Sequence, residues 1–514
     1  MTYYLTLRKP RLKVDSSTRS PPLVNHQALR NVTYYIMFKE SIVPDPVGSS
    51  VRPLRVAIIG AGPAGFYAAG ALFTQRQLSV SIDLFERLPA PHGLVRYGVA
   101  PDHPKIKTVT RVFDRTATAT GFRFFGNIEF GSDVTRADLH RYYDAIIYSI
   151  GAQADRKLSI PGEELAGSMS ATAFVAWYNG HPDFVDLAVD LSGESAIVVG
   201  VGNVALDVAR ILASSKDELA ATDIALYAEE TLAASHIREI HVLARRGPAQ
   251  AKFTTAEIKE FGELAAADIV IDPAELRLDP ASAAEVAQNV EAQRNLAALQ
   301  ELAALPLRGR PRRVYVHFLV SPVEILGADG HVQAVRIEQN ELRVDANGAI
   351  NAYGAGRFFT LPAQLVLRAV GYRGTPLADV PYDMRSGVVP NTKGRVYDPA
   401  SGQTLAGEYV TGWAKRGPTG VIGTNRADAN ETIDSLLADL TTLTPAPEPD
   451  PAAIEQLLRQ RELRFVSLEG WQLIDQLEVA RGQPRGKPRI KFTNVDEMLA
   501  IVPEEKPSAT PGSN

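Results

Sequence analysis

The chain has 514 residues, of which 45% are hydrophobic and 22% charged, and its formal net charge is −5. This length suffices for two or three domains with ordinary cores, and the composition is typical of a globular enzyme. The small negative charge excludes a global attraction to nucleic acid, so a charged partner must recognise a local patch. Cysteine is absent, which excludes disulfides, cysteine-ligated iron–sulfur clusters and a redox-active cysteine pair.

The first fifty residues differ in composition from the rest. Up to Lys39 they contain seven Lys or Arg, several Ser and a single acid, Asp15, a pattern that resembles a transit peptide. A disordered extension and a translation start at Met37 are the simpler interpretations. We therefore expect a cytoplasmic protein, with organellar targeting by residues 1–39 as the alternative. No apolar run approaches the ~18 residues of a membrane span, so no transmembrane segment is expected.

Two cycles of strand, helix and strand follow each other along the chain. The first consists of residues 55–60, 64–73 and 79–86, and the second of residues 195–200, a helix starting near Asn203 and residues 240–244. Further strands are predicted at 145–150, 365–370 and 408–411, helical cover at 273–306, and a proline-rich linker at 445–451 before an amphipathic C-terminal portion. Two such openings predict an α/β protein with two Rossmann-like, doubly wound domains.

The first cycle carries a complete dinucleotide-binding fingerprint. Gly60 permits a tight turn, Gly62 lets backbone amides approach a pyrophosphate, and Gly65 lets the helix pack closely on the strand. Glu86 ends the following strand, where a carboxylate can accept hydrogen bonds from ribose hydroxyls. A glycine-rich turn alone can be purely structural, but strand, turn, helix, strand and acid appear here in order. The pattern indicates a bound dinucleotide.

The second cycle has a modified fingerprint. Gly200 and Gly202 are retained, and alanine stands in the third position at Ala205, a variant that the motif tolerates. Where the first cycle has Glu86, the second has Arg245 and Arg246. Two guanidinium groups can grip a 2′-phosphate that a carboxylate would repel, so this site favours NADP over NAD. The alternative is an ordinary solvated arginine pair.

Two different nucleotides bound in one chain indicate hydride transfer between a nicotinamide and a flavin, because the protein has no redox cysteine. The Glu86 site suits FAD and the Arg245 site suits NADPH. We expect an FAD-binding domain at 51–154 and 370–502, an inserted NADP-binding domain at 155–369, an extension at 1–50 and a disordered tail at 503–514.

Four segments, in order along the chain, resemble the adrenodoxin-reductase branch of ferredoxin–NADP reductases. They are HGLVRYGVAPDHPK at 92–105, GNVALDVAR at 202–210, RRGP at 245–248 and GWAKRGPTGVIGTN at 412–425. The resemblance extends from about residue 55 to about residue 501, and the last motif is long and specific. It differs at His92, where relatives commonly carry a bulkier apolar ring.

The resemblance implies which residues contact the cofactors. For FAD they would be Gly60, Gly62, Ala64, Gly65, Glu86, Leu94, Val134, Trp413, Gly420, Val421 and Ile422, with Trp413 and residues 420–422 against the isoalloxazine. For NADPH they would be Arg156, Val201, Gly202, Asn203, Val204, Arg245, Arg246, Glu257 and Gly420. No histidine spacing indicates a metal ligand set.

Three residues are candidates for a direct part in catalysis. His103 matches a position near the flavin in the family, and imidazole titrates near neutral pH; a histidine packed between two prolines is the alternative. Glu260 lies one helical turn from Glu257 and is expected to reach the same cavity. Trp413, between a strand and the glycine-rich loop, is expected to contact the flavin, with a core aromatic as the alternative.

The resemblance also implies a ferredoxin or adrenodoxin-type iron–sulfur protein as the electron acceptor. Such partners are generally acidic, so we expect a basic docking surface. The candidates are Arg308, Arg310, Arg312 and Arg313; Arg481, Arg485, Lys487, Arg489 and Lys491; and Lys252 with Lys259. Other functions stay open: a quinone or dye reductase, a monooxygenase, and a nucleotide-binding flavoprotein without turnover. The sequence does not distinguish a monomer from a dimer.

Overall fold

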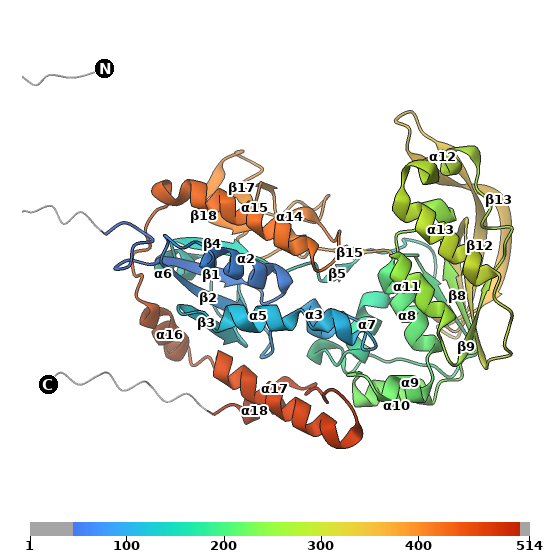
Figure 1. Ribbon diagram of the computed structural model, residues 1–514, viewed down its shortest axis with the longest axis horizontal. Coiled ribbons are helices and arrows are strands. Elements are labelled where there is room, and N and C mark those ends of the chain that lie inside the picture. Colours follow the sequence, from blue (N-terminus) through green and yellow to red (C-terminus); the bar gives the residue numbers. More distant parts are fainter. Residues whose placement is uncertain (1–44, 504–514) are drawn as a thin grey trace, which may run out of the picture. The chain divides into compact units, whose positions relative to one another are not determined.

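The computed structural model describes residues 45–503 (Figure 1). Most of the extension predicted for residues 1–50, including the targeting alternative, lies outside these residues, as does the tail after Pro503. Among the described residues, no helix combines the length and apolar character required to span a bilayer.

The first sheet has seven strands in the order β16-β17-β18-β4-β1-β2-β3. Its bounds are β1 (Leu54–Ile59), β2 (Val80–Glu86), β3 (Phe122–Gly126), β4 (Ala145–Tyr148), β16 (Asn391–Thr392), β17 (Arg395–Tyr397) and β18 (Thr404–Val410). β1 pairs in parallel with both β2 and β4, and all six of its residues are buried. The helices α2 (Pro63–Phe73), α5 (Thr110–Ala117) and α15 (Thr424–Asp439) lie side by side against this sheet (Figure 1). The predicted central parallel strands are confirmed.

The second sheet has six parallel strands in the order β6-β14-β7-β8-β10-β9. They are β6 (Ser168–Ser170), β7 (Ser195–Val199), β8 (Glu239–Leu243), β9 (Ala267–Ile271), β10 (Arg312–His317) and β14 (Leu365–Arg368). The helices of this region are α7 (Ala171–Tyr178), α8 (Asn203–Ala213), α9 (Lys216–Ala220), α10 (Leu226–Ala233), α11 (Thr255–Lys259), α12 (Pro280–Gln288) and α13 (Val290–Ala303). In chain order this whole sheet lies between the strands of the first, so two Rossmann-like units are confirmed.

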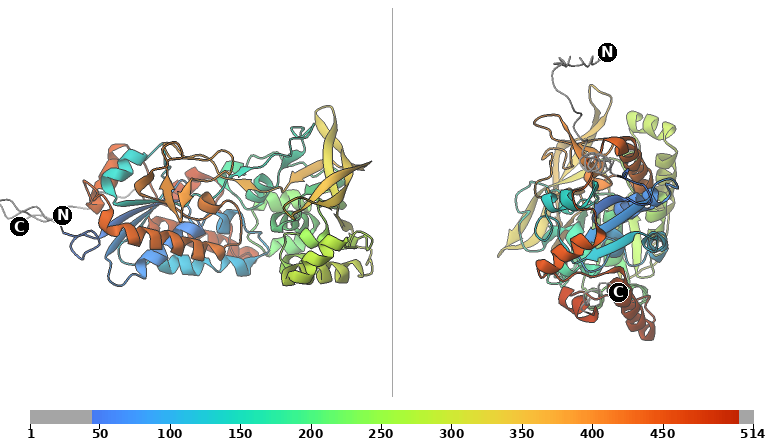
Figure 2. Two further views of the ribbon diagram at one scale, coloured as in Figure 1. Left: turned by 90° about the horizontal axis from the view of Figure 1, so that it is seen from above. Right: turned by 90° about the vertical axis from the view of Figure 1, so that its left-hand side faces the viewer.

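A third, antiparallel sheet was not predicted. It contains β11 (Val320–Ala328), β12 (His331–Val344) and β13 (Ile350–Pro362). Alternate residues of β12, among them Val335 and Ile337, are buried in one cluster with Ile197 and Val366 of the second sheet. Figure 2 shows the yellow strands of this sheet on one side and the yellow-green helices α12 and α13 on the other. The third sheet therefore covers the face of the second sheet that those helices leave open.

Two short strands connect the regions of the two large sheets. β5 (Ala154–Asp155) pairs antiparallel with β15 (Tyr372–Arg373). The remaining helices are α3 (Leu94–Tyr97), α4 (Pro104–Lys107), α6 (Arg136–Tyr142), α14 (Trp413–Arg416), α16 (Pro451–Gln460), α17 (Leu468–Gly482) and α18 (Val495–Ile501). The predicted linker packs against the chain, because Ala446 is buried and its N–H donates to Asp144 Oδ1 at 2.8 Å.

Candidate functional site

The turn after β1 has the geometry that its three glycines predict. Gly60 has a φ of +103°, and a Cβ there would lie 2.8 Å from the carbonyl oxygen of Ser149. A Cβ at Gly65 would lie 2.3 Å from the oxygen of Gly60, so only glycine lets α2 approach the turn. A Cβ at Gly62 would meet nothing within 4 Å. The second glycine therefore keeps an open face beside the start of α2, the end of a helix that favours a phosphate.

The Glu86 carboxyl group accepts hydrogen bonds from the backbone at this turn. Its Oε2 accepts a hydrogen bond from the N–H of Ala61 at 2.9 Å, and Oε1 accepts one from Leu88 at 3.3 Å. Burial raises the pKa of the Glu86 carboxyl, although these backbone hydrogen bonds act in the opposite direction. The carboxyl group thus lies at the carboxyl end of β2, directly beside the glycine turn, where the sequence placed it.

Leu94 and Val134 have different surroundings. The helix α3, which begins at Leu94, comes close to the turn, because a Cβ on Gly93 would lie 3.0 Å from Gly62 Cα. Val134 is fully buried in a cluster that includes Phe85. Its side chain is used in the core, and the structure does not bring it to an open surface.

The turn after β7 repeats the arrangement. Gly200 has a φ of +129°, and a Cβ there would lie 2.3 Å from the oxygen of Ala369, whereas a Cβ at Gly202 would meet nothing within 4 Å. Asn203 begins α8, and its Oδ1 accepts a hydrogen bond from the N–H of Thr254 at 2.9 Å. The open turn, residues 201–204, is thus fastened to the segment that leads into α11.

Arg245 and Arg246 follow β8 at the same edge of the second sheet. Val199 pairs with Leu243 in parallel register, so the two arginines leave their strand beside the Gly200 turn. Their backbone is held by the third sheet, where Asn340 Nδ2 donates to the oxygen of Arg245 at 2.9 Å. Neither guanidinium group has an ion pair among residues 45–503. Two unneutralised cations beside an open glycine turn form a site for an anionic group.

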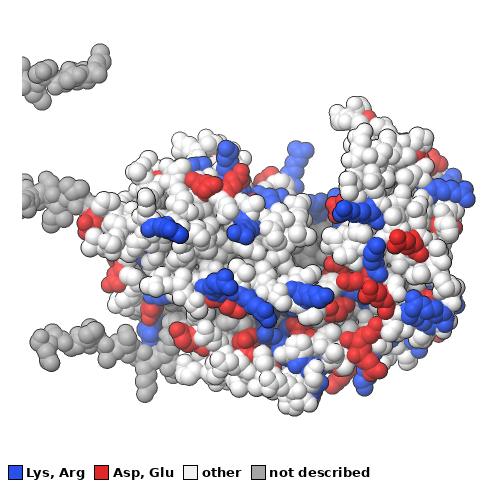
Figure 3. Space-filling model, viewed as in Figure 1, with Lys and Arg blue, Asp and Glu red and all other residues white. Residues whose placement is uncertain are grey.

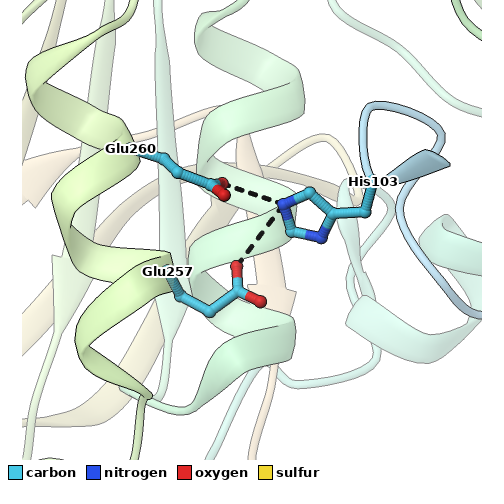
Figure 4. A group of neighbouring side chains, drawn as sticks. All are labelled: His103, Glu257 and Glu260. Atoms are coloured by element: carbon cyan, nitrogen blue, oxygen red, sulfur yellow. Dashed lines mark hydrogen bonds and ion pairs between the residues drawn. The ribbon is translucent and has the colours of Figure 1, made fainter. Parts of the chain in front are cut away.

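His103 joins the two regions of the molecule. It immediately precedes α4, and its Nε2 lies 2.8 Å from Glu260 Oε2 and 3.7 Å from Glu257 Oε2 (Figure 4). Burial lowers the pKa of His103, but the hydrogen bond with Glu260 and the charges of Asp207 and Glu257 outweigh it and raise the pKa above its ordinary value. Burial, with the charge of Asp207, raises the pKa of Glu257 to about 7. Glu257 and Glu260 are therefore found together, as predicted, and His103 joins them, which was not predicted.

Arg210 is the residue of this cluster that the sequence did not single out. Its Nη1 lies 3.3 Å from Glu257 Oε2 and 3.1 Å from Glu260 Oε2, and its Nε lies 2.6 Å from Asp102. A guanidinium thus stands where a metal ion would have to meet both glutamates. Asp207 and Arg210 belong to the 202–210 motif and lie three residues apart on α8, which was the signal available.

The loop after β18 packs against the start of α2. Gly412 has a φ of +73°, and a Cβ there would come within 2.6 Å of Ala64 Cβ. Asp428, on α15, accepts hydrogen bonds from Gly412 N–H at 2.5 Å and from Thr411 Oγ1 at 2.9 Å. Trp413 begins α14, and its Nε1 donates to the oxygen of Thr419 at 3.1 Å.

Residues 420–422 come next and lead into α15. Val421 is 58% exposed, and its N–H donates to Thr424 Oγ1 at 3.1 Å. Ile422 packs partly on the core of the first sheet. The Trp413 ring lies 5.2 Å from that of Tyr372, the β15 residue that pairs with Asp155 of β5. Arg156 is exposed beside the same strand pair, with its N–H bonded to the oxygen of Gly371 at 3.1 Å.

Three residues of the predicted basic clusters are used inside the molecule, whereas Arg308, Arg313, Arg481, Arg485, Lys252 and Lys259 are exposed and stay candidates. Lys487 and Lys491 are buried, and their Nζ atoms lie 2.6 Å from Glu229 and 3.2 Å from Asp223. Arg489 pairs with Asp475 at 2.5 Å. The expectation that these residues offer free charge to a partner is therefore wrong, because they bind the C-terminal segment to its own chain.

Two open glycine turns, followed at the next strand by an acid in one case and an arginine pair in the other, define the class: an α/β oxidoreductase with two dinucleotide-binding folds. Residues 54–263 match the model of the pyridine nucleotide-disulphide oxidoreductase family. The disulfide chemistry in that description is absent here, since the chain has no cysteine.

More specific relatives cover nearly the whole chain. It is 45% identical over 462 residues to the NADPH-ferredoxin reductase FprA of Mycobacterium tuberculosis, covering 88% of this chain and 99% of that protein. It is 40% identical to the mitochondrial NADPH:adrenodoxin oxidoreductase of Arabidopsis thaliana, covering 88% of this chain and 96% of that one. A solved structure of Mycobacterium tuberculosis FprA in complex with NADPH matches with a TM-score of 0.83 and 44% identity, over 88% of this chain and 99% of that one. The chain therefore belongs to the family of NADPH-ferredoxin and NADPH:adrenodoxin reductases, and the family assignment made from its motifs is confirmed.

Proposed function

We propose that this protein transfers hydride from NADPH to bound FAD and then passes single electrons to a ferredoxin or adrenodoxin-type iron–sulfur protein. The observation that carries the proposal is the pair of glycine turns, each with an open face and each followed by a side chain suited to a different nucleotide. In this proposal residues 51–154 and 370–502 form the FAD-binding domain and residues 155–369 the NADP-binding domain.

The first turn fits FAD. The open face at Gly62 admits a pyrophosphate, and the Glu86 carboxyl lies where a ribose hydroxyl would be recognised. The contact of Gly412 with Ala64 brings Trp413 and residues 420–422 to the same helix end. The residues proposed to hold FAD are Gly60, Gly62, Ala64, Gly65, Glu86, Leu94, Trp413, Gly420, Val421 and Ile422. Val134 is buried in the core, so we propose only that it supports the residues of the FAD site.

The second turn fits NADPH. The open face at Gly202 admits its pyrophosphate, and Arg245 and Arg246 supply the charge that the 2′-phosphate requires. The residues proposed to hold NADPH are Arg156, Val201, Gly202, Asn203, Val204, Arg245, Arg246, Glu257 and Gly420. The solved structure of the Mycobacterium relative is a complex with NADPH, which supports this assignment.

The cluster around His103 has a proposed part in the reaction. A bound flavin accepts electrons in pairs from a nicotinamide and releases them one at a time. His103 is held by Glu260 and contacts Glu257, so it joins the FAD side to the NADP side at one atom, Nε2. We assign to His103 and Glu260 the storage of a proton at this boundary, and to Trp413 the covering of the flavin ring.

The partner follows from the family. The Mycobacterium relative is called a ferredoxin reductase, and the proposed acceptor for this chain is therefore a small iron–sulfur protein. A cytoplasmic location stays our proposal, with organellar import as the alternative, since one relative is called mitochondrial.

The experiment compares electron acceptors in turnover assays of the purified protein. The released flavin is identified by chromatography against FAD and FMN, and turnover is measured with NADPH and NADH. Release of FAD and reduction of ferredoxin with NADPH in strong preference to NADH support the proposal. Release of FMN, or turnover only with a quinone or an oxygen-dependent substrate, contradicts it.

A further inference from the structure

A basic surface with an apolar centre lies on α4 and α5, and only its first residue, Lys105, belongs to a motif of the sequence. It consists of the exposed residues Lys105, Ile106, Arg111, Val112 and Arg115, here called the α4–α5 surface. Ile106 is 42% exposed and Val112 is 48% exposed. Figure 3 shows a row of blue side chains crossing this part of the molecule.

The three cations of this surface have no ion pair among the described residues, unlike Lys487, Arg489 and Lys491 of the C-terminal segment. Arg111 and Arg115 lie four residues apart and so share one face of α5. The helix has one acid, Asp114, and its Oδ1 lies 3.4 Å from His92 Nε2. Asp114 is itself exposed, so the surface offers three cations against one acid and keeps a net positive charge for a partner.

The position of the surface relates it to the hydride site. His103 is the residue before α4, and Lys105 and Ile106 follow it within one helical turn. His103 in turn reaches Glu260 across the boundary of the two regions. A protein seated on α4 would thus approach the molecule next to the proposed site of electron transfer.

We propose that the α4–α5 surface is the docking site of the acidic iron–sulfur acceptor. The inference rests on the proposed function and adds its partner surface. The cations attract the acidic face of the acceptor and speed its approach, while Ile106 and Val112 supply the dry contact at the centre of the complex. Apolar residues surrounded by unpaired charge are the usual anatomy of such a transient interface.

The test uses the full chain with its flavin and a purified plant-type [2Fe–2S] ferredoxin of net negative charge. Arg111→Glu reverses one of the three positive charges of the surface. The matched control is Arg76→Glu, because Arg76 is exposed after α2 and carries no ion pair in the described chain. Both variants change the net charge equally, so a general charge effect cancels between them.

The measurement is the KM for ferredoxin at low and moderate salt. The ferredoxin turnover of each variant is divided by the turnover of the same variant with ferricyanide. We expect Arg111→Glu to raise this KM roughly threefold to tenfold at low salt and to weaken its salt dependence. Arg76→Glu should leave the KM at the wild-type value. Equal values for both variants and the wild type, or equal rises in both variants, would overturn the docking site.

A second measurement identifies the contact itself. Zero-length carbodiimide coupling joins lysine amines to carboxylates of the bound ferredoxin, and peptide mapping should find Lys105 among the coupled lysines. Coupling confined to lysines outside the α4–α5 surface would contradict the inference. A wild-type protein that reduces ferricyanide but never ferredoxin would instead refute the proposed function, so the two failures are distinguishable.

Discussion

His103 Nε2 lies 2.8 Å from Glu260 Oε2, although 157 residues separate the two in the chain. The first residue precedes α4 beside the first sheet, and the second directly follows α11 beside the second sheet. This hydrogen bond ties the two nucleotide-binding regions together at the place where the proposed electron transfer begins. It also acts to raise the pKa of the imidazole.

Glu260→Gln should lower the pKa of His103. The pKa is raised in the folded protein, so the protonated ring stabilises the fold fully below the unfolded pKa of about 6.5. That contribution is lost as the pH rises through the higher folded value. The amide removes the first of the raising causes while burial remains, so the titration moves toward lower pH. NMR titration of the ring, with the pH profile of flavin reduction by NADPH, measures this shift.

The control for this prediction is Glu263→Gln, an exposed acid three residues further along the same segment. It should leave the titration of His103 in place. An unchanged titration in Glu260→Gln would show that the observed hydrogen bond does not govern the pKa.

Gly65→Ala should lower the stability of the protein, whereas Gly62→Ala should remove its flavin. At Gly65 the new methyl group would meet the oxygen of Gly60 at 2.3 Å, and such overpacking costs about 1–3 kcal/mol of stability. At Gly62 it would meet no protein atom, so the melting temperature should stay near that of the wild type while the flavin is lost. Thermal unfolding and the ratio of flavin to protein absorbance test the pair. Gly62→Ala protein that stays fully yellow would remove the proposed pyrophosphate site.

Arg245→Ala should weaken NADPH binding without a matching effect on NADH. A charge-assisted hydrogen bond to the 2′-phosphate is worth about 1.5–3 kcal/mol, or roughly a tenfold to hundredfold rise in Kd. Arg238→Ala is the control, because Arg238 precedes the opposite end of β8. Equal losses of NADPH and NADH affinity in Arg245→Ala would argue against recognition of the 2′-phosphate.

Asp428→Ala should loosen the loop that carries Trp413. The half-buried carboxylate accepts from Gly412 N–H and lies 3.3 Å from both Lys415 and Arg416. Its removal leaves buried donors unpaired, which costs about 1–3 kcal/mol. Urea unfolding measures the loss of stability. Asp434→Ala, an exposed change on the same helix, should be close to neutral; if the two variants unfold alike, Asp428 does not hold the loop.

Both nucleotide-binding turns could be predicted from the sequence because their signals are local. A β-branched run that ends in glycine specifies the strand and the turn by itself, as at Gly60 and Gly200. The antiparallel sheet was missed, although Asn347 and Gly348 stand between β12 and β13 and such a pair is a strong hairpin signal. The alternating apolar residues of β12 are a second signal for this sheet.

The rest of the site depends on contacts that no local pattern encodes. The approach of Arg210 to Glu257 and Asp102 needs two separate regions to be folded together. The charge of Lys491 looked available in the sequence but is buried against Asp223. A run of basic residues does not reveal burial, which is why the α4–α5 surface emerged only from the structure.

The most direct test of the central claim is an anaerobic titration of the purified flavoprotein, followed by flavin absorbance. NADPH should bleach the flavin at far lower concentration than NADH, and oxidised ferredoxin should then restore the colour. A yellow protein that neither nucleotide bleaches would contradict hydride transfer between the two sites.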